Sequence, residues 1–229
     1  MHTGELSSEF DEAGRLEPQV MINQLSLVEL AVLGIRQLIL AGSAQPGDRV
    51  TEEWLASKLG ISRPPIREAI QVLLQQGLLE RSPRRGVRVT ELTDEDIADL
   101  YALRLVLDRY ALTLGLPMTD GRGLDRMRVA LGDMRASVVS GDHALYVDAN
   151  RDFHLGLVAL GNSKRLSMVY EGLMNQMQLL MSINLSREAT RGRQEGVRRH
   201  EALLAAIETG DLATALAALD AHGERRFLL

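Results

Sequence analysis

Residues 49–89 read RVTEEWLASKLGISRPPIREAIQVLLQQGLLERSPRRGVRV, and this stretch decides the fold. Thr51 is a good N-cap, and apolar side chains recur at helical spacing after it as far as Gly60, which is typical of a helix C-terminus. Ser62 is the expected N-cap of a second helix, whose first turn holds two prolines where a missing N–H costs nothing. Gly77 ends that helix. The sequence therefore predicts two short helices joined by a tight turn.

A small β-wing is predicted directly after the second helix. Residues 78–81 and 87–89 are short extended runs, and the turn SPRRG between them carries two guanidinium groups. A helix, a turn, a second helix and a basic wing form an arrangement that places the second helix in the DNA major groove. The alternative is a winged helix used only for protein contacts, which has no need of adjacent arginines at the wing tip. The expected DNA contacts are Thr51, Ser62, Arg63, Pro65, Arg67, Arg84, Arg85 and Gly86.

The charge of the chain is unevenly distributed. Over 229 residues the formal net charge is −5, yet residues 24–90 hold nine Lys and Arg against six Asp and Glu. A mildly basic segment in an acidic chain favours a specific DNA-binding protein, because attraction to phosphate stays local. The negative net charge argues against an architectural protein that coats DNA.

Composition excludes several other classes. The chain has no cysteine, which rules out disulfides, thiolate chemistry and zinc fingers. No apolar run reaches the roughly 18–20 residues of a membrane span, and the acidic N-terminus is unlike a signal peptide. We therefore expect a cytoplasmic protein that lies on the nucleoid when bound to DNA, with no membrane partner. The expected division is a flexible arm at 1–22, a DNA-binding domain at 23–91 and an all-helical domain at 92–229.

After the wing the chain reads as consecutive helices. Thr93 is an N-cap followed by an acidic first turn, which suits the helix dipole. Gly, Pro and Asn separate the helical stretches, and no alternating strand pattern appears. The helices are expected at residues 94–116, 120–140, 142–160, 164–189, 193–209 and 211–226. Joined by short loops, they form an antiparallel bundle, so the predicted fold is mostly α: a winged helix-turn-helix followed by an all-α bundle.

Three histidines within these helices are candidates for a metal site. His154, His200 and His222 border apolar stripes on three different helices, and Asn150 precedes the first of them by one helical turn. Three imidazoles and one side-chain oxygen that converge inside a bundle would form a metal site. The alternative is a set of ordinary core histidines, each satisfied by a carboxylate or by water.

Arg104 lies on the first helix of the bundle, at the edge of its expected buried face. It either pairs with Asp108 at i,i+4 spacing or reaches into the bundle to take a carboxylate in bidentate fashion. Asn175 and Gln178 either offer a polar strip to the same ligand or face solvent. The expected buried face of the helix consists of Leu100, Leu103, Leu107, Ala111 and Leu114.

The first half of the chain resembles the winged helix-turn-helix domain of the GntR family of bacterial transcription regulators. One departure is Glu53, which stands where family members often carry an arginine that touches DNA. The resemblance implies operator DNA with two half-sites, bound by a homodimer of matching two-fold symmetry. The positions that carry it include Leu55-Ala56, Leu59-Gly60, Ser62-Arg63, Pro65, Arg67-Glu68-Ala69, Leu73, Gly77-Leu78 and Gly86.

The helical half is similar to the FCD domain, the effector-binding domain of the FadR branch of that family. The segments that carry this likeness are Leu100-Tyr101-x-x-Arg104, Phe153-His154-x7-Asn162, His200-x6-Ile207-x-x-Gly210-Asp211 and Ala215-x6-His222. Many FCD domains hold a divalent metal through an Asp and three His, and here Asn150 stands where the carboxylate usually does. The resemblance implies one divalent ion per chain, zinc first, with nickel, manganese or iron open. It also implies a small organic acid held by Arg104.

Together these expectations describe a ligand-responsive bacterial transcription regulator. We expect it to act as a repressor that binds palindromic operator DNA as a homodimer. A small carboxylate bound near the metal would control it. The alternative is a metal-dependent hydrolase that uses the three histidines, since an open metal position activates water. Against an enzyme, no carboxylate is placed as a general base, and Asp152 points away from its neighbour His154.

Overall fold

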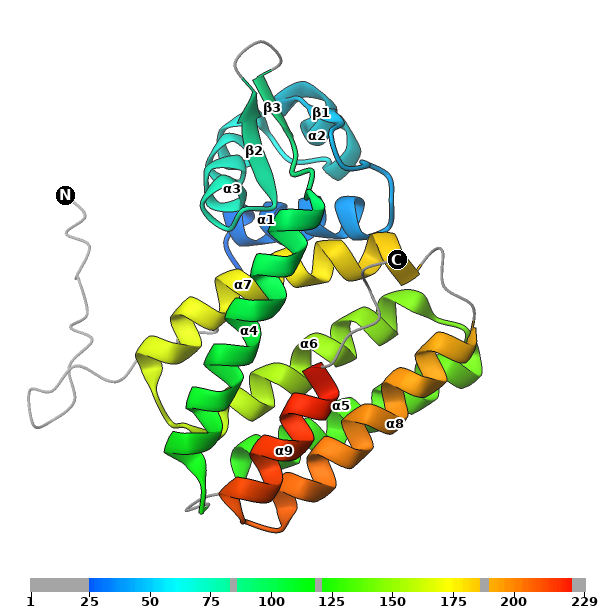
Figure 1. Cartoon of the computed structure of the whole chain (residues 1–229). Helices are drawn as coiled ribbons and strands as arrows, with labels where there is room; N and C mark the ends of the chain where they lie inside the picture. Colours follow the sequence, from blue (N-terminus) through cyan, green and yellow to red (C-terminus); the bar gives the residue numbers. More distant parts are fainter. Residues whose placement is uncertain (1–24, 83–85, 118–120, 186–189, 224–229) are drawn as a thin grey trace, which may run out of the picture.

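In the computed structural model the described residues are 25–82, 86–117, 121–185 and 190–223. The elements in chain order are α1 (Leu27–Leu40), β1 (Arg49–Val50), α2 (Glu52–Leu59), α3 (Arg63–Gln75), β2 (Leu79–Ser82), β3 (Gly86–Val89), α4 (Asp94–Gly115), α5 (Arg122–Ser140), α6 (His143–Leu160), α7 (Lys164–Leu185), α8 (Thr190–Glu208) and α9 (Leu212–Gly223). Elements α1 to β3 form an N-terminal part, and α4 to α9 form a helical bundle below it (Figure 1). This arrangement confirms the mostly α class predicted from the sequence.

The N-terminal part is a winged helix-turn-helix. Its sheet has the strand order β1-β3-β2, and both neighbouring pairs are antiparallel. The hydroxyl of Thr51 accepts the N–H of Trp54 at 3.2 Å and so caps α2, which ends at Gly60 in the left-handed region. Helix α1 packs against α3, and the two bury an apolar core that includes Ile35 and Ile66.

Helix α3 begins without a capping hydrogen bond. Ser62 has the extended backbone of an N-cap, with φ −64° and ψ 157°, but its side chain makes no cap hydrogen bond. An N-cap oxygen ordinarily accepts the N–H of the second or third helical residue. Here these residues are Pro64 and Pro65, which have no N–H. Ser62 is therefore the N-cap residue, as predicted, but it makes no side-chain hydrogen bond to the helix.

The bundle follows the predicted helix order closely. The observed bounds lie within about three residues of the expected ones wherever the expected bound is a described residue. The expected start at 120 and the expected ends at 189 and 226 lie outside the described residues. Helices α5 and α6 pack at close range, since a Cβ on Gly156 would lie 2.8 Å from Met127 Cγ and 2.9 Å from the carbonyl oxygen of Gly123. No helix in the described part of the chain is long and apolar enough to cross a membrane.

The buried face of α4 differs from the expected one. Leu103 and Leu114, which were predicted to be buried, are 48% and 46% exposed. Their places in the core face are taken by Arg104 and Asp108, which are 7% and 1% exposed. Leucine spacing alone cannot distinguish a face that meets the core of the same chain from an apolar face left on the surface. The helix is thus turned so that two charged residues point inward.

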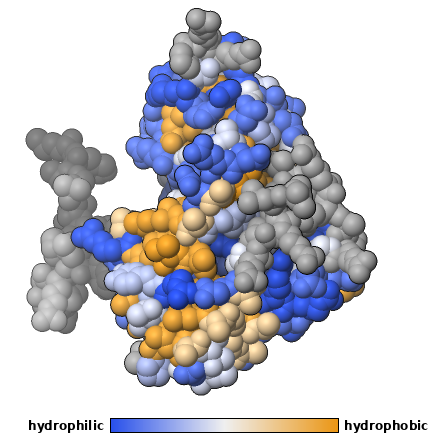
Figure 2. Space-filling view, in the orientation of Figure 1, coloured by the Kyte–Doolittle hydropathy of each residue, from blue (hydrophilic) through white to orange (hydrophobic). Residues whose placement is uncertain are grey.

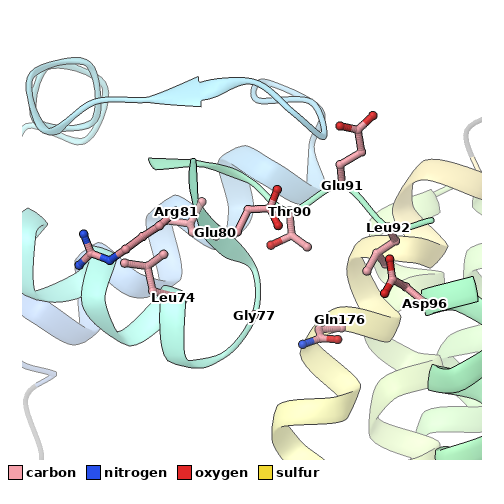
Figure 3. Close-up of a pocket in the computed structure, with 10 residues that line it drawn as sticks. Leu74, Gly77, Glu80, Arg81, Thr90, Glu91, Leu92, Asp96 and Gln176 are labelled. Carbon is pink, nitrogen blue, oxygen red and sulfur yellow. The ribbon is translucent and has the colours of Figure 1, made fainter. Parts of the chain in front are cut away.

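Helix α7 joins the bundle to the N-terminal part. Its Leu179 is a member of the apolar core of the N-terminal part, and α1 packs against it. Gly77 has a φ of +71°, and a Cβ there would come within 2.0 Å of Gln176 Nε2 on α7. Figure 3 shows this junction, where Gly77 and Gln176 both line a hollow of about 530 Å³ between the two parts. The two parts are therefore in direct contact, with α7 packed against α1 and Gly77.

Candidate metal centre and nucleic-acid interface

The three predicted histidines meet inside the bundle. His154 on α6, His200 on α8 and His222 on α9 are 0%, 5% and 8% exposed. One ligand nitrogen of each lies within 4.8 Å of the other two, and the closest pair of rings, His200 and His222, has its centroids 4.4 Å apart. Among the His, Cys, Asp and Glu of the described residues, this is the group with spacing suited to a metal ion.

Several nitrogens of this cluster are buried without a hydrogen-bond partner. His200 Nδ1 donates to the carbonyl of Gly196 at 2.7 Å, which leaves the lone pair on Nε2 without a partner. Both ring nitrogens of His154 and Nδ1 of His222 also lack a hydrogen bond. A buried polar atom left unsatisfied costs about 1–3 kcal/mol. The donor set therefore fits a bound divalent ion better than it fits a set of satisfied core histidines.

Burial favours the neutral form of these imidazoles. Desolvation lowers the pKa of His154, and it lowers the pKa of both His200 and His222 well below the ordinary value. The positive charge of Arg104 also lowers all three pKa values, while Asp108 acts in the opposite direction on the pKa of His154. A neutral imidazole keeps the lone pair that a metal requires. The cluster is thus poised to bind a cation at neutral pH.

Asp108 on α4 lies next to the cluster and was not among the predicted site residues. Its Oδ2 is 3.5 Å from His154 Nδ1 and 3.7 Å from Arg104 Nε, while its Oδ1 accepts the hydroxyl of Tyr170. Desolvation and the charge of Asp108 raise the pKa of Tyr170 well above its ordinary value, so this hydroxyl remains a donor. The spacing of Arg104 and Asp108 was visible in the sequence. The contacts with α6 and α7 were not, because they depend on how the helices pack.

The position of Arg104 agrees in part with each of the two interpretations drawn from the sequence. It pairs with Asp108, as the simpler interpretation expected, but the pair is buried in the bundle rather than exposed. Its guanidinium carbon lies 5.2 Å from the centre of the Tyr101 ring, and its Nε has no hydrogen bond. A buried guanidinium with an unused donor is suited to an anionic ligand.

Asn150 is 4% exposed, one turn before His154 on α6. Its Nδ2 lies 3.1 Å from Met181 Sδ, so the amide nitrogen is turned toward α7. This arrangement leaves the amide oxygen as the atom with which Asn150 would meet an ion.

Asn175 and Gln178 on α7 are both 4% exposed, so the solvent-facing alternative was wrong. Gln178 Nε2 donates to Asp148 Oδ1 at 2.7 Å, and the side-chain oxygens of both amides are buried without a hydrogen bond. These two oxygens are free to accept hydrogen bonds from a ligand.

The exposed end of α3 carries the arginines expected to read DNA. Arg67 donates to both carboxylate oxygens of Glu52 at 2.8 and 2.9 Å, and Arg63 lies 3.7 Å from Glu53. The hydrogen bond with Arg67 lowers the pKa of Glu52, and the same bond raises the pKa of Arg67. Both arginines are therefore paired with glutamates of α2 in this structure.

The other residues expected to contact DNA lie on different elements of the N-terminal part. Thr51 uses its hydroxyl to cap α2, Pro65 lies in the first turn of α3, and Gly86 begins β3 with a φ of +77°. The wing-tip residues Arg84 and Arg85 lie outside the described residues.

Comparison with known proteins defines the class. The FCD domain family matches residues 99–225, and the gntR family of bacterial regulatory proteins matches residues 27–89. The chain therefore belongs to the GntR family and carries an FCD domain, as the sequence motifs predicted. It is a transcription regulator and not an enzyme, so the hydrolase alternative was wrong.

Individual relatives agree with this class. A putative transcriptional regulator GntR from Rhodococcus sp. RHA1 has a similar structure, with a TM-score of 0.75 and 27% identity, over 86% of this chain and 93% of that one. The gluconate operon transcriptional repressor of Bacillus licheniformis is 26% identical over 86% of this chain and 82% of that protein. The HTH-type transcriptional regulator YdhC of Bacillus subtilis (strain 168) is 30% identical over 60% of this chain, which spans 62% of that relative's length.

Proposed function

We propose that this regulator is a repressor that binds palindromic operator DNA as a homodimer and is controlled by a small organic acid bound beside a divalent metal. The observation that carries this proposal is the cluster of buried, unsatisfied imidazole nitrogens next to the buried Arg104. Relatives that are named as operon repressors support the direction of control. Action on DNA is consistent with the expected location in the cytoplasm, on the nucleoid.

The metal centre would be formed by three imidazoles and one amide. His154, His200 and His222 would supply nitrogens and Asn150 an oxygen, with zinc as the first candidate and nickel, manganese or iron as the others. The ion would supply a positive charge that attracts the carboxylate of the effector. Because Asn150 brings no negative charge, this attraction is stronger than it would be beside an aspartate.

Arg104 would hold the effector by bidentate hydrogen bonds to a carboxylate. Asn175 and Gln178 have bare side-chain oxygens, so they would accept hydroxyl or N–H groups of the same molecule. An acid that carries further hydroxyl groups would have the chemistry to bond with all three side chains. Metal and effector then bind cooperatively, each raising the affinity for the other by the same factor.

The α4 stripe is the surface we propose for the homodimer, and it consists of Leu103, Val106, Tyr110 and Leu114. These side chains are 48%, 60%, 52% and 46% exposed and recur every three or four residues along α4. Figure 2 shows apolar side chains gathered below the N-terminal part, over α4. An exposed apolar stripe of this kind marks an interaction site, and a two-fold axis would let the stripe pair with itself.

The dimer can be tested with two matched substitutions. Val106→Glu places a charge within the α4 stripe, whereas Val139→Glu places the same charge on α5, where the valine is 90% exposed. We expect light scattering to show a dimer for the parent and for Val139→Glu, and a shift toward monomer for Val106→Glu. A parent protein that is monomeric at micromolar concentration would refute the dimer.

We assign DNA recognition to the N-terminal part, and we place the boundary between the DNA-binding domain and the helical domain at residues 91–92. Arg63 and Arg67 would contact base edges, and Thr51, Ser62, Pro65 and Gly86 would lie against the sugar-phosphate backbone. The wing-tip Arg84 and Arg85 would anchor to phosphate or the minor groove.

The control by metal and acid is tested on an operator selected from random DNA. Binding would be followed by gel shift with the ion, with carboxylates, and with both together. We expect about one divalent ion per chain after gentle purification, lost with chelator and absent in His200→Ala. A carboxylate should release the operator only from metal-loaded protein. If zinc and nickel both fail to bind stoichiometrically, the cluster is a set of core histidines.

A further inference from the structure

We infer that Asp108 is the positioning residue of the proposed metal centre. Its carboxylate would hold His154 so that Nε2 faces the ion. This inference rests on the proposed metal site and goes beyond it, because Asp108 is neither a histidine of the cluster nor part of the motif that predicted the cluster.

The first argument is the tautomer of His154. A neutral imidazole carries its hydrogen on one nitrogen only, and the partner of that nitrogen decides which one it is. Asp108 Oδ2 lies 3.5 Å from Nδ1, and a carboxylate oxygen can only accept. The hydrogen therefore belongs on Nδ1, and the lone pair on Nε2 is left for a metal. A carboxylate behind a ligating histidine fixes its orientation and raises its basicity.

The second argument is that His200 is arranged in the same way. Its Nδ1 donates to the carbonyl of Gly196 at 2.7 Å, so its Nε2 is also the free nitrogen. Two histidines on different helices thus have an acceptor behind Nδ1 and a bare Nε2. A buried core histidine would ordinarily have a partner for both nitrogens, whereas Nε2 of each of these two has none.

The third argument separates this role from direct ligation. Asp108 is not one of the residues whose ligand atoms lie mutually within 4.8 Å, so its effect on the ion passes through His154. The carboxylate is itself fixed, because Tyr170 donates to Oδ1 and the side chain is 1% exposed. Oδ2, which faces His154, has no conventional hydrogen bond. This oxygen is therefore available to accept the Nδ1 hydrogen of His154.

The test compares Asp108→Asn with Asp152→Asn. Asp152 lies on α6 two residues before His154, but its carboxylate is 49% exposed and pairs with Arg126. Zinc affinity would be measured by competition with a chromophoric chelator, with circular dichroism as the check on folding. We expect Asp108→Asn to weaken zinc binding by about ten- to a hundredfold, and Asp152→Asn to bind as the parent does.

A second measurement needs no substitution, so it holds even if Asp108→Asn fails to fold. Parent protein labelled with 15N and loaded with 113Cd should show nitrogen–cadmium coupling at His154 Nε2 and a hydrogen on Nδ1. Ligation of the ion through His154 Nδ1 would overturn the role of Asp108 but not the metal site. An unchanged zinc affinity in a folded Asp108→Asn variant would do the same. A parent that binds no ion overturns the metal site itself, and this role with it.

Discussion

Replacing Leu179 by alanine tests whether α7 holds the DNA-binding domain in place. Leu179 is 1% exposed, and among the described residues it is the one buried bundle residue within the apolar core of α1 to β3. Truncating a buried leucine costs the lost transfer energy plus a term for the remaining cavity, together about 3–5 kcal/mol. Because this side chain lies between the two domains, its truncation should mainly weaken the packing of one domain against the other. We expect the DNA-binding domain to unfold at lower temperature than the bundle.

The assay is scanning calorimetry combined with hydrogen exchange of the α1 amides. The matched control is Leu173→Ala, the same chemical change on the same helix, at a residue that is 7% exposed and belongs to the bundle core. Leu173→Ala should lower the stability of the bundle and leave the α1 amides protected. Leu179→Ala should speed exchange in α1. If the two variants lose similar stability and α1 exchange is unchanged in both, α7 does not hold the DNA-binding domain.

Three further predictions concern the sites. Arg67→Ala should lower operator affinity on the order of ten- to a hundredfold and relax the preference at one base; fluorescence anisotropy that shows no change would remove the proposed docking. Because burial lowers the pKa of His154, His200 and His222 below the usual 6.5, the metal-free folded protein binds fewer protons than the unfolded chain in acid. Its stability should therefore be fully present above about pH 6.5 and fall as the pH drops below that value, and urea unfolding that is independent of pH from 8 to 5 would contradict this. Asn150→Asp should tighten the metal and weaken the acid, and calorimetry that shows the acid bound as well as in the parent would end that argument.

Local patterns account for what the sequence predicted well. Capping residues and helix-ending glycines depend on neighbours within a few positions, so Thr51, Gly60 and Thr93 marked helix ends that the structure shows. The three histidines were found because each lay on the apolar face of its own helix. Their meeting in space followed from bundle geometry and from the family resemblance, not from spacing alone.

Contacts between helices account for what was missed. Asp108 was visible only as an i,i+4 partner of Arg104, since its contacts with His154 and Tyr170 require α4, α6 and α7 to be packed. The same limit explains the error over Leu103, because an apolar side chain looks alike in sequence whether it meets its own core or lies on the surface. The contact of Leu179 on α7 with the core of the DNA-binding domain is likewise tertiary, so the sequence pattern of α7 did not reveal it.

The uncapped start of α3 bears on the thermodynamics of DNA association. Helix ends ordinarily fray unless a side chain caps them, and ordering a frayed end on binding costs conformational entropy. Pro64 and Pro65 fix φ close to its helical value without any cap, so the turn that carries Arg63 is already ordered in the free protein. Association at this end therefore orders side chains more than backbone. Affinity differences between operators should then appear mainly as differences in dissociation rate.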